Sequence, residues 1–530
     1  MEFDLIIEGG TVIDGTGSRS FKADLAVDRG RICDIGDLRR AAAGSTIDAR
    51  GMTVSPGFID IHGHSDISLL VCPGADSKIM QGVTSEISGN CGESGAPVSD
   101  ETIQDFTAAG DRFGIKVDWR SLGGLLSRLE GTISINYGTL VGLGTVRGAV
   151  MGSVDRRPTS EELSRMKSLV KESLEDGAMG VSTGLVYAPG MYSETDELTE
   201  LTACARGSKA FYATHMRSEG DDIGRAVEEA LNIARSAGLP LQISHLKTVG
   251  RENWGKMPDI LTRLEQAAGE GFDVTADRYP YTASATGLTA ILPRWAHEGG
   301  RMELLERLRR EEEREKVKEA VEERIGDVGW DNILITNTWS ADTRNLEGRS
   351  LADSASEQGM DPSDLLVEVI LQSQGLASIL AFSQDEDDMV LTLCHPLVML
   401  GSDSGIRSLT GVLAQGKPHP RAYGSFPAFY RILVRERRLL TPEQAIHKMT
   451  GMQARRLGLN QRGLLRKGYW ADIVVFDSDS FQDTATYQNP HSHPMGVECV
   501  IVNGKLTVQN GMHTNERSGM VLRGGVWSGP

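Results

Sequence analysis

Short apolar segments recur through the middle of the chain, each followed by a longer stretch of helical character, and this rhythm constrains the fold most strongly. The candidate strands are, in chain order, GFIDI, TSEISG, INYGTLVG, AMGVSTG, FYATH, LQISH, FDVTADRY and LVMLGSD, between residues 57 and 403. Strands that alternate with helices favour a parallel sheet with crossover helices. Eight such units predict an α/β protein built on a (β/α)8 TIM-like barrel with insertions.

The two ends of the chain follow a different pattern, in which short apolar runs alternate with turns. Segments such as DLIIEGGTVIDGTG near the start resemble GYWADIVVFD and GVECVIVNGKLTVQNG near the end, where Asn503-Gly504 is a hairpin signal. We predict a small β-sandwich domain from residues 1–55 and the later part of 441–530, which begins with a helix, around a barrel at 56–440. The charge-rich RMELLERLRREEEREKVKEAVEERIGDV favours an inserted helical segment at about 287–345.

Composition excludes several classes of partner. The formal net charge is −18, whereas nucleic acids and anionic membranes require a concentrated basic surface. No run of about 18 apolar residues is present, so we expect no membrane span. The start, MEFDLIIEGG, lacks a basic region followed by an apolar one, which favours a cytoplasmic protein without a secretory signal. We expect a small-molecule partner and leave association into a homo-oligomer open.

Residues that can bind a metal ion follow the predicted strands. If the strands form a barrel, functional groups gather at their carboxyl ends. A lone histidine is usually a satisfied polar residue and a lone cysteine a small buried hydrophobe. A whole set at one rim is harder to explain in that way, and imidazole, thiolate and carboxylate are all zinc ligands. The candidate metal ligands are His62, His64, Cys91, His215, His245 and Asp403.

The same residues resemble a known group of enzymes. An HxH pair after the first strand, histidines after the fifth and sixth, and an aspartate after the eighth resemble the amidohydrolase superfamily. The closer resemblance is to the N-acyl-D-amino-acid deacylases, or D-aminoacylases, because GNCG and PHPRAYG are narrower signals. Supporting stretches occur in order along nearly the whole chain: SPGFIDIHGHSD, GNCG, GVSTGLVYAPGMYSETDEL, THMRSE, SHLKTVGRENWGK, DRYPYTASATGL, GSDSG, KPHPRAYGSFP, MTGMQARRLGL and RKGYWADIVVFD.

The resemblance implies a zinc-dependent hydrolase that cleaves N-acyl-D-amino acids to a carboxylate and a free D-amino acid. It places one tight zinc ion on Cys91, His215 and His245, with His62, His64 and Asp403 around a second position, so one or two ions are expected. The cysteine of GNCG takes the place of the carboxylated lysine that bridges the metals of many superfamily members. Asp403 is expected to act as the general base toward a metal-activated water.

A deacylase of this kind must also bind the free carboxylate of the amino acid. Cationic and hydroxyl donors are its natural partners. The positions that match the family are Lys247, Tyr279, Thr286 and Arg421. Two departures from the family pattern, Leu246 and Ala428, leave the preferred side chain and acyl group open. The mostly apolar stretch TAILPRW at 289–295 favours substrates whose amino-acid side chain is apolar or neutral. Arg294 within this stretch is suited to an acidic side chain of the substrate.

Three other functions compete with this interpretation. A D-specific dipeptidase needs the same carboxylate clamp and differs only on the acyl side. A cyclic-amide hydrolase of the hydantoinase or dihydroorotase type shares the barrel, but those relatives generally use the carboxylated lysine. A scaffold without activity is the third, because a fold alone does not determine function.

Overall fold

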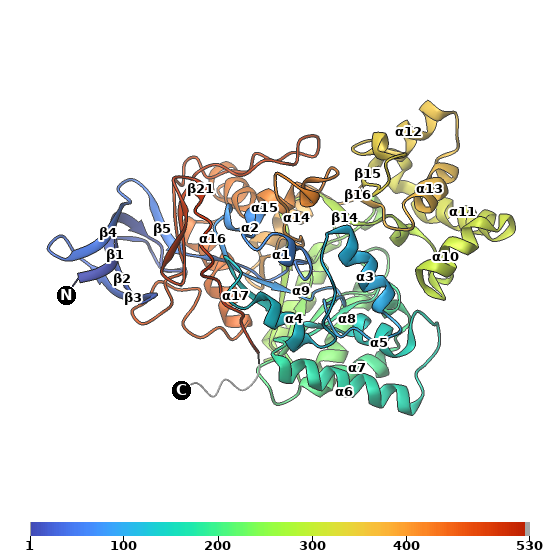
Figure 1. The fold of residues 1–530 in the computed structure, drawn as a ribbon, viewed down its shortest axis with the longest axis horizontal. Coiled ribbons are helices and arrows are strands. Elements are labelled where there is room, and N and C mark those ends of the chain that lie inside the picture. The colour runs from blue at the N-terminus through green and yellow to red at the C-terminus, as the bar shows by residue number, and fades with distance from the viewer. Residues whose placement is uncertain (1, 525–530) are drawn as a thin grey trace.

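The computed structural model describes residues 2–524 and shows an α/β protein (Figure 1). A parallel strand forms within each of the eight predicted segments, and the third segment forms two short strands separated by Leu140. The strands are β6 (Phe58–Asp60), β7 (Val83–Ser88), β8 (Asn136–Thr139), β9 (Val141–Gly142), β10 (Gly180–Gly184), β11 (Phe211–His215), β12 (Leu241–Ile243), β13 (Val274–Arg278) and β17 (Val398–Leu400).

These strands form two parallel sheets whose edge strands, β6 and β17, lie next to each other. The larger sheet has the order β17-β13-β12-β11-β10-β9 and the smaller one β6-β7-β8. Beyond the ends of β6 and β17, the Asp403 amide donates to the His62 carbonyl at 2.8 Å and the His64 amide to the Ser404 carbonyl at 3.2 Å. The other two edge strands, β8 and β9, belong to different sheets and are separated in the chain by Leu140 alone, so the chain also links the sheets at those edges.

Helices connect the parallel strands and follow the last of them. The principal ones are α4 (Leu122–Leu129), α5 (Leu143–Met151), α6 (Ser160–Asp176), α7 (Thr195–Thr202), α8 (Ile223–Ala237), α9 (Met257–Gly269), α14 (Glu386–Cys394), α15 (Arg421–Tyr430), α16 (Pro442–Met449) and α17 (Gly451–Arg456). In α6, the Thr159 hydroxyl accepts from the Glu162 amide and the Glu162 carboxylate from the Thr159 amide, which satisfies two free donors at the helix start. Gly177, with φ of 118°, ends the helix. Shorter helices are α1 (Ser68–Val71), α2 (Asp76–Ile79) and α3 (Ile103–Arg112).

Both ends of the chain build one nine-stranded sheet, which lies at one end of the molecule in Figure 1. Its strands are β1 (Glu2–Val12), β2 (Phe21–Asp28), β3 (Arg31–Gly36), β4 (Ala42–Asp48), β5 (Thr53–Pro56), β18 (Ile473–Phe476), β19 (Val497–Val502), β20 (Lys505–Gln509) and β21 (Met512–His513). The antiparallel pairing of β5 with β18 joins the two halves. Leu5 and Val27 share one buried cluster with Ile473 and Ile501, so neither half has a complete core alone.

An insertion between β13 and β17 lies at the opposite end of the molecule (Figure 1). The charge-rich stretch forms α10 (Gly300–Arg309) and α11 (Glu311–Ile325), as its composition predicts. Two more helices, α12 (Leu351–Gln358) and α13 (Pro362–Gln372), and an antiparallel sheet of β14 (Ala283–Gly287), β15 (Ile333–Asn337) and β16 (Ser378–Phe382) join them around a separate buried cluster. The insertion is therefore longer than the predicted 287–345, because β14 begins before that range and α12, α13 and β16 follow it. Short strands such as ASATG carry too little periodicity to be predicted.

Between residues 2 and 524, the helices are too short or too polar to span a lipid bilayer.

Candidate metal centre

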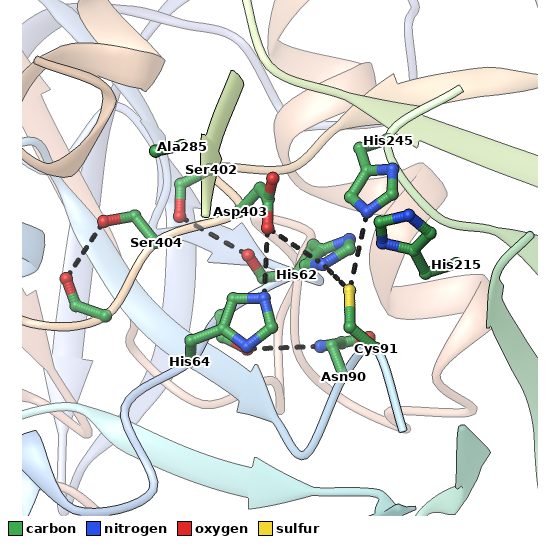
Figure 2. Close-up of polar contacts among 12 residues, drawn as sticks. His62, His64, Asn90, Cys91, His215, His245, Ala285, Ser402, Asp403 and Ser404 are labelled. Atoms are coloured by element: carbon green, nitrogen blue, oxygen red, sulfur yellow. Dashed lines mark hydrogen bonds and ion pairs between the residues drawn. The ribbon is translucent and has the colours of Figure 1, made fainter. Parts of the chain in front are cut away.

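Four side chains that are remote in sequence converge just beyond the carboxyl ends of the parallel strands. His62, Cys91, His245 and Asp403 are buried, and one ligand atom of each lies within 4.8 Å of those of the others. His215 and His245 lie in a second group of this kind together with Glu219. Figure 2 shows His64 beside Asp403 and His215 beside His245. All six ligands predicted from the sequence therefore meet in one place.

The Cys91 sulfur lies at the middle of the cluster. Its Sγ is 3.4 Å from His62 Nε2 and 3.5 Å from His245 Nε2. Asp403 Oδ1 is 3.0 Å from His64 Nε2 and 3.4 Å from His62 Nε2. The rings of His215 and His245 are nearly perpendicular, with centroids 4.4 Å apart. Nitrogen, sulfur and oxygen atoms at these separations are suited to surround one or two cations.

Three of the candidate ligands have an unusual backbone conformation. Cys91, His245 and Asp403 have φ values of 53°, 34° and 51°, in the left-handed region that residues other than glycine rarely occupy. Such conformations persist where the surroundings hold them, and they are concentrated at functional sites. Around Cys91 the fit is tight, since a Cβ at Gly184 would collide with the Cys91 carbonyl oxygen. The fold therefore holds these side chains in place at some conformational cost.

A buried lysine supports the loop that carries Asp403. Lys78 has no exposed surface, and its Nζ donates to Asp60 Oδ2 at 2.6 Å, Ser402 Oγ at 2.7 Å and the Ser404 carbonyl at 2.8 Å. The two serines flank Asp403, so the lysine fixes the loop on both sides of it. No sequence pattern around Lys78 marks it for this role.

The electrostatics of the cluster fit a bound cation. Burial raises the pKa of the Cys91 thiol, but the facing imidazoles of His62 and His245 lower it well below its ordinary value. Burial likewise raises the pKa of Asp403, and the Arg421 guanidinium lowers it well below the usual range. Burial lowers the pKa of His215, whose Nδ1 has no hydrogen-bond partner within residues 2–524. Thiolate, carboxylate and imidazole groups are the kinds of donor that zinc binds.

Two carboxylates that sequence analysis missed orient the histidines. Asp277 Oδ1 lies 2.9 Å from His62 Nδ1 and accepts the His245 amide at 2.9 Å. Glu219 Oε1 lies 2.9 Å from His245 Nδ1, and its Oε2 lies 3.8 Å from His215 Nε2. These contacts leave the opposite ring nitrogens of His62 and His245 facing Cys91. Their positions offered a signal, because Asp277 lies near the end of the seventh strand and Glu219 four residues after His215.

The residues predicted to bind a carboxylate adjoin this cluster. Arg421 Nη1 lies 2.7 Å from Asp403 Oδ2, and its guanidinium is 4.7 Å from the ring centre of Tyr279. Lys247 is almost fully buried, pairs with Glu219, and lies 5.8 Å from the same ring. Thr286 is placed differently, because its hydroxyl contacts the Tyr187 hydroxyl at 3.2 Å.

Arg294 was the residue suited to bind an acidic side chain of the substrate. In the structure its guanidinium pairs with the Asp155 carboxylate at 2.7 Å, and its side chain is half exposed.

An α/β fold with thiolate, imidazole and carboxylate donors at the strand ends defines a class of proteins that bind metal ions at this rim. The family model described as "Amidohydrolase family" matches residues 45–508. The chain belongs to the amidohydrolase family.

Individual relatives show which group within the family the chain resembles. The chain is 36% identical to a D-aminoacylase and 37% identical to an N-acyl-D-aspartate deacylase, both from Alcaligenes xylosoxydans xylosoxydans. These alignments cover 98% of this chain in each case, and 97% and 95% of the two relatives. The resemblance to N-acyl-D-amino-acid deacylases that the motifs predicted is confirmed.

A solved structure confirms the fold class. The crystal structure of N-acyl-D-glutamate deacylase from Bordetella bronchiseptica, in complex with zinc and a phosphonate mimic of the tetrahedral intermediate, is 34% identical, with a TM-score of 0.84. The match covers 99% of this chain and 100% of that one. The chain therefore has the α/β fold of these amidohydrolases.

Proposed function

We propose that this chain is a zinc-dependent hydrolase that cleaves the amide bond of N-acyl-D-amino acids, releasing a carboxylate and a free D-amino acid. The observation that carries this proposal is the convergence of His62, Cys91, His245 and Asp403 within 4.8 Å, with Arg421 in contact with Asp403. The similar proteins named above, all deacylases of N-acyl-D-amino acids or D-aminoacylases, support the substrate class.

The proposal includes a finer description of the fold. We infer that the parallel strands of the eight predicted segments close a (β/α)8 barrel at about 56–440, and that the nine-stranded sheet forms a small β-sandwich from 1–55 and 441–530. The backbone hydrogen bonds between the segments that follow β6 and β17 support closure. The buried cluster shared by both chain ends supports the sandwich.

Cys91, His215 and His245 would hold one zinc ion, and His62, His64 and Asp403 would flank a second, as the family resemblance implies. A zinc ion held there would lower the pKa of a water molecule to roughly 7 and would polarise the amide carbonyl. The protein's own contribution is to present the ligands in fixed orientations. Asp277 and Glu219 perform this task through the outer nitrogens of His62 and His245.

Asp403 carries the proton in the proposed reaction. Its Oδ2 is held by Arg421, whereas its Oδ1 faces His62 and His64. Oδ1 is therefore the oxygen placed to accept a proton from the attacking water and to return it to the leaving amine. The left-handed conformation of Asp403, supported by Lys78 through the flanking serines, holds that oxygen toward the cluster.

The free carboxylate of the substrate would bind on the Arg421 side of Asp403. Arg421 and Lys247 supply positive charge there, and both lie near the face of Tyr279. Thr286, through its contact with Tyr187, offers a hydroxyl donor at the edge of this region. With the carboxylate and the acyl carbonyl both held, a third contact that admits the side chain on only one side of the α carbon would distinguish D from L substrates.

We also propose that the protein is cytoplasmic. All six cysteines are free, which fits the reducing conditions of the cytoplasm. Association of identical chains stays a prediction.

A panel of N-acetyl-D- and N-acetyl-L-amino acids, D-dipeptides and cyclic imides, assayed for released amine with and without a chelator, tests the proposal. We expect chelator-sensitive turnover of the acetyl-D compounds. Asp403→Asn should keep its zinc and lose about 10²–10⁴-fold in kcat. Asp155→Asn, at the half-exposed pair with Arg294, is the matched control and should behave as the unmodified protein. Turnover confined to L-isomers, dipeptides or cyclic imides would overturn the proposal, as would a protein that binds no zinc when zinc is supplied and turns over none of the substrates.

A further inference from the structure

A large cavity adjoins the metal centre. Its volume is about 910 Å³, and His64 and Cys91 are among the residues that line it. It continues along α3, the start of α10 and one face of α5. Pockets of roughly 300–1,000 Å³ hold drug-sized ligands, so this volume far exceeds the needs of an acetyl group.

The cavity reaches Asp403 through His64, and its lining residue Tyr187 contacts Thr286 at the border with the proposed carboxylate site. His64, which lines the cavity, contacts Asp403 Oδ1, whereas Arg421 contacts Oδ2. Within the described part of the chain, none of the four residues predicted to bind the carboxylate lines it. If the amino-acid carboxylate binds beside Arg421 and the scissile carbonyl lies at the ligand cluster, the acyl group extends toward the cavity.

Helix α5 forms one wall of the cavity, and one of its glycines has room for a side chain. Gly144 and Gly148, four residues apart on this helix, both line the cavity. A Cβ at Gly144 would lie 2.8 Å from the Gly92 carbonyl oxygen, so packing explains that glycine. At Gly148 the nearest atoms, on Pro189 and Thr102, would be 3.7 Å away, which is ordinary contact. A larger side chain at Gly148 would occupy cavity space.

Apolar side chains contribute to the lining and the cover. Phe106, Phe113 and Leu413 line the cavity, and Phe113 also packs edge to face against Trp339 of the insertion, with ring centroids 5.5 Å apart. Charged residues line the cavity as well: Glu93, Glu101 and Asp105 are exposed to solvent, whereas Asp66, Arg301 and Arg407 are partly buried. An extended hydrocarbon chain can pack against the apolar residues while the exposed carboxylates remain in water.

We propose that this cavity is an acyl-binding site, and that the preferred substrates carry a bulky apolar acyl chain of several carbons beyond acetyl. The inference rests on the proposed function and adds the class of acyl group to it. Gly148 is the specificity-determining position, because its missing side chain keeps the cavity open beside the metal centre.

The test is a series of N-acetyl, N-butanoyl, N-hexanoyl and N-octanoyl derivatives of one apolar and one acidic D-amino acid. Each methylene buried in the cavity should raise kcat/KM by roughly three- to fourfold until the cavity is filled. Gly148→Leu should lower the ratio of octanoyl to acetyl kcat/KM by at least about tenfold, since it fills the same space. Gly269→Leu is the control and should leave that ratio unchanged, because Gly269 is an exposed helical glycine where an added Cβ would have no atom within 4 Å.

Different failures have different meanings. Turnover of acetyl substrates with no gain from longer acyl chains overturns the acyl site and leaves the proposed function standing. A rate that follows the amino-acid side chain rather than the acyl chain also overturns it. Absence of turnover with every acyl group overturns the proposed function and this inference together. The series on the unmodified protein decides the question even if Gly148→Leu fails to fold.

Discussion

Replacing Asp277 by asparagine should weaken zinc binding while preserving the fold. The carboxylate is buried and accepts from three donors: His62 Nδ1 at 2.9 Å, the His245 amide at 2.9 Å and Gln242 Nε2 at 2.8 Å. Alanine would leave all three without a partner, at about 1–3 kcal/mol each, and is therefore a poor probe. Asparagine retains the volume and one acceptor oxygen.

The magnitude follows from the charge that asparagine removes. Hydrogen bonds to charged groups contribute about 1.5–3 kcal/mol and neutral ones about 0.5–1.5 kcal/mol, so the loss is about 1–1.5 kcal/mol per bond. One such bond holds the His62 ring and another the backbone of His245. Together they amount to about 2–3 kcal/mol, which corresponds to a rise of roughly 30–150-fold in the zinc dissociation constant. The kcat of the zinc-saturated variant should fall less, because the ring is misplaced rather than removed.

Zinc affinity is measured by competition with a chelator of known affinity, and folding by thermal unfolding. Asp361→Asn is the matched control: Asp361 caps the start of α13, where asparagine serves equally well, so neither quantity should change. If Asp277→Asn binds zinc as tightly as the unmodified protein, Asp277 does not position His62, and the orientation argument fails.

Three further predictions concern separate parts of the site. Cys91→Ala should lose the tightly held zinc, measured by elemental analysis after dialysis, and full retention would remove the thiolate from the ligand set. Burial raises the pKa of Glu219, but Lys247 and His245 lower it below its ordinary value of 4.5; the group therefore stabilises the fold above that pH and the contribution disappears as the pH falls. Glu219→Gln should accordingly lower the melting temperature near pH 7 and flatten its decline below about pH 5, whereas an unchanged slope would contradict the assignment. Lys78→Met leaves the buried Asp60 carboxylate without its cation and should cost about 3–5 kcal/mol of unfolding free energy in a denaturant titration; a loss below about 1 kcal/mol, the value of a surface pair, would contradict it.

Local sequence patterns predicted much of the framework. Strand segments such as FYATH and LQISH are short, apolar and followed by a polar residue, and both the strand and its end are encoded within a few residues. In a parallel sheet the carboxyl ends of strands lie at one edge, so His215 and His245 could be placed together before any coordinates. The antiparallel sheet of the insertion was missed, since β14 and β16 pair across about 90 residues and their short sequences do not indicate a partner.

The chain by itself determined the chemical identity of the ligands and their order around the strand ends, because residue type and local periodicity are properties of short stretches. Only the tertiary structure decided which atoms face one another. Asp277 reaches His62 across 215 residues, and Lys78 reaches Ser402 across 324, so these contacts depend on how the strands are paired and cannot be inferred from either segment alone. The space beside Cys91 has the same origin, since α3, α5 and α10 enclose it only after the insertion has packed beside the parallel strands.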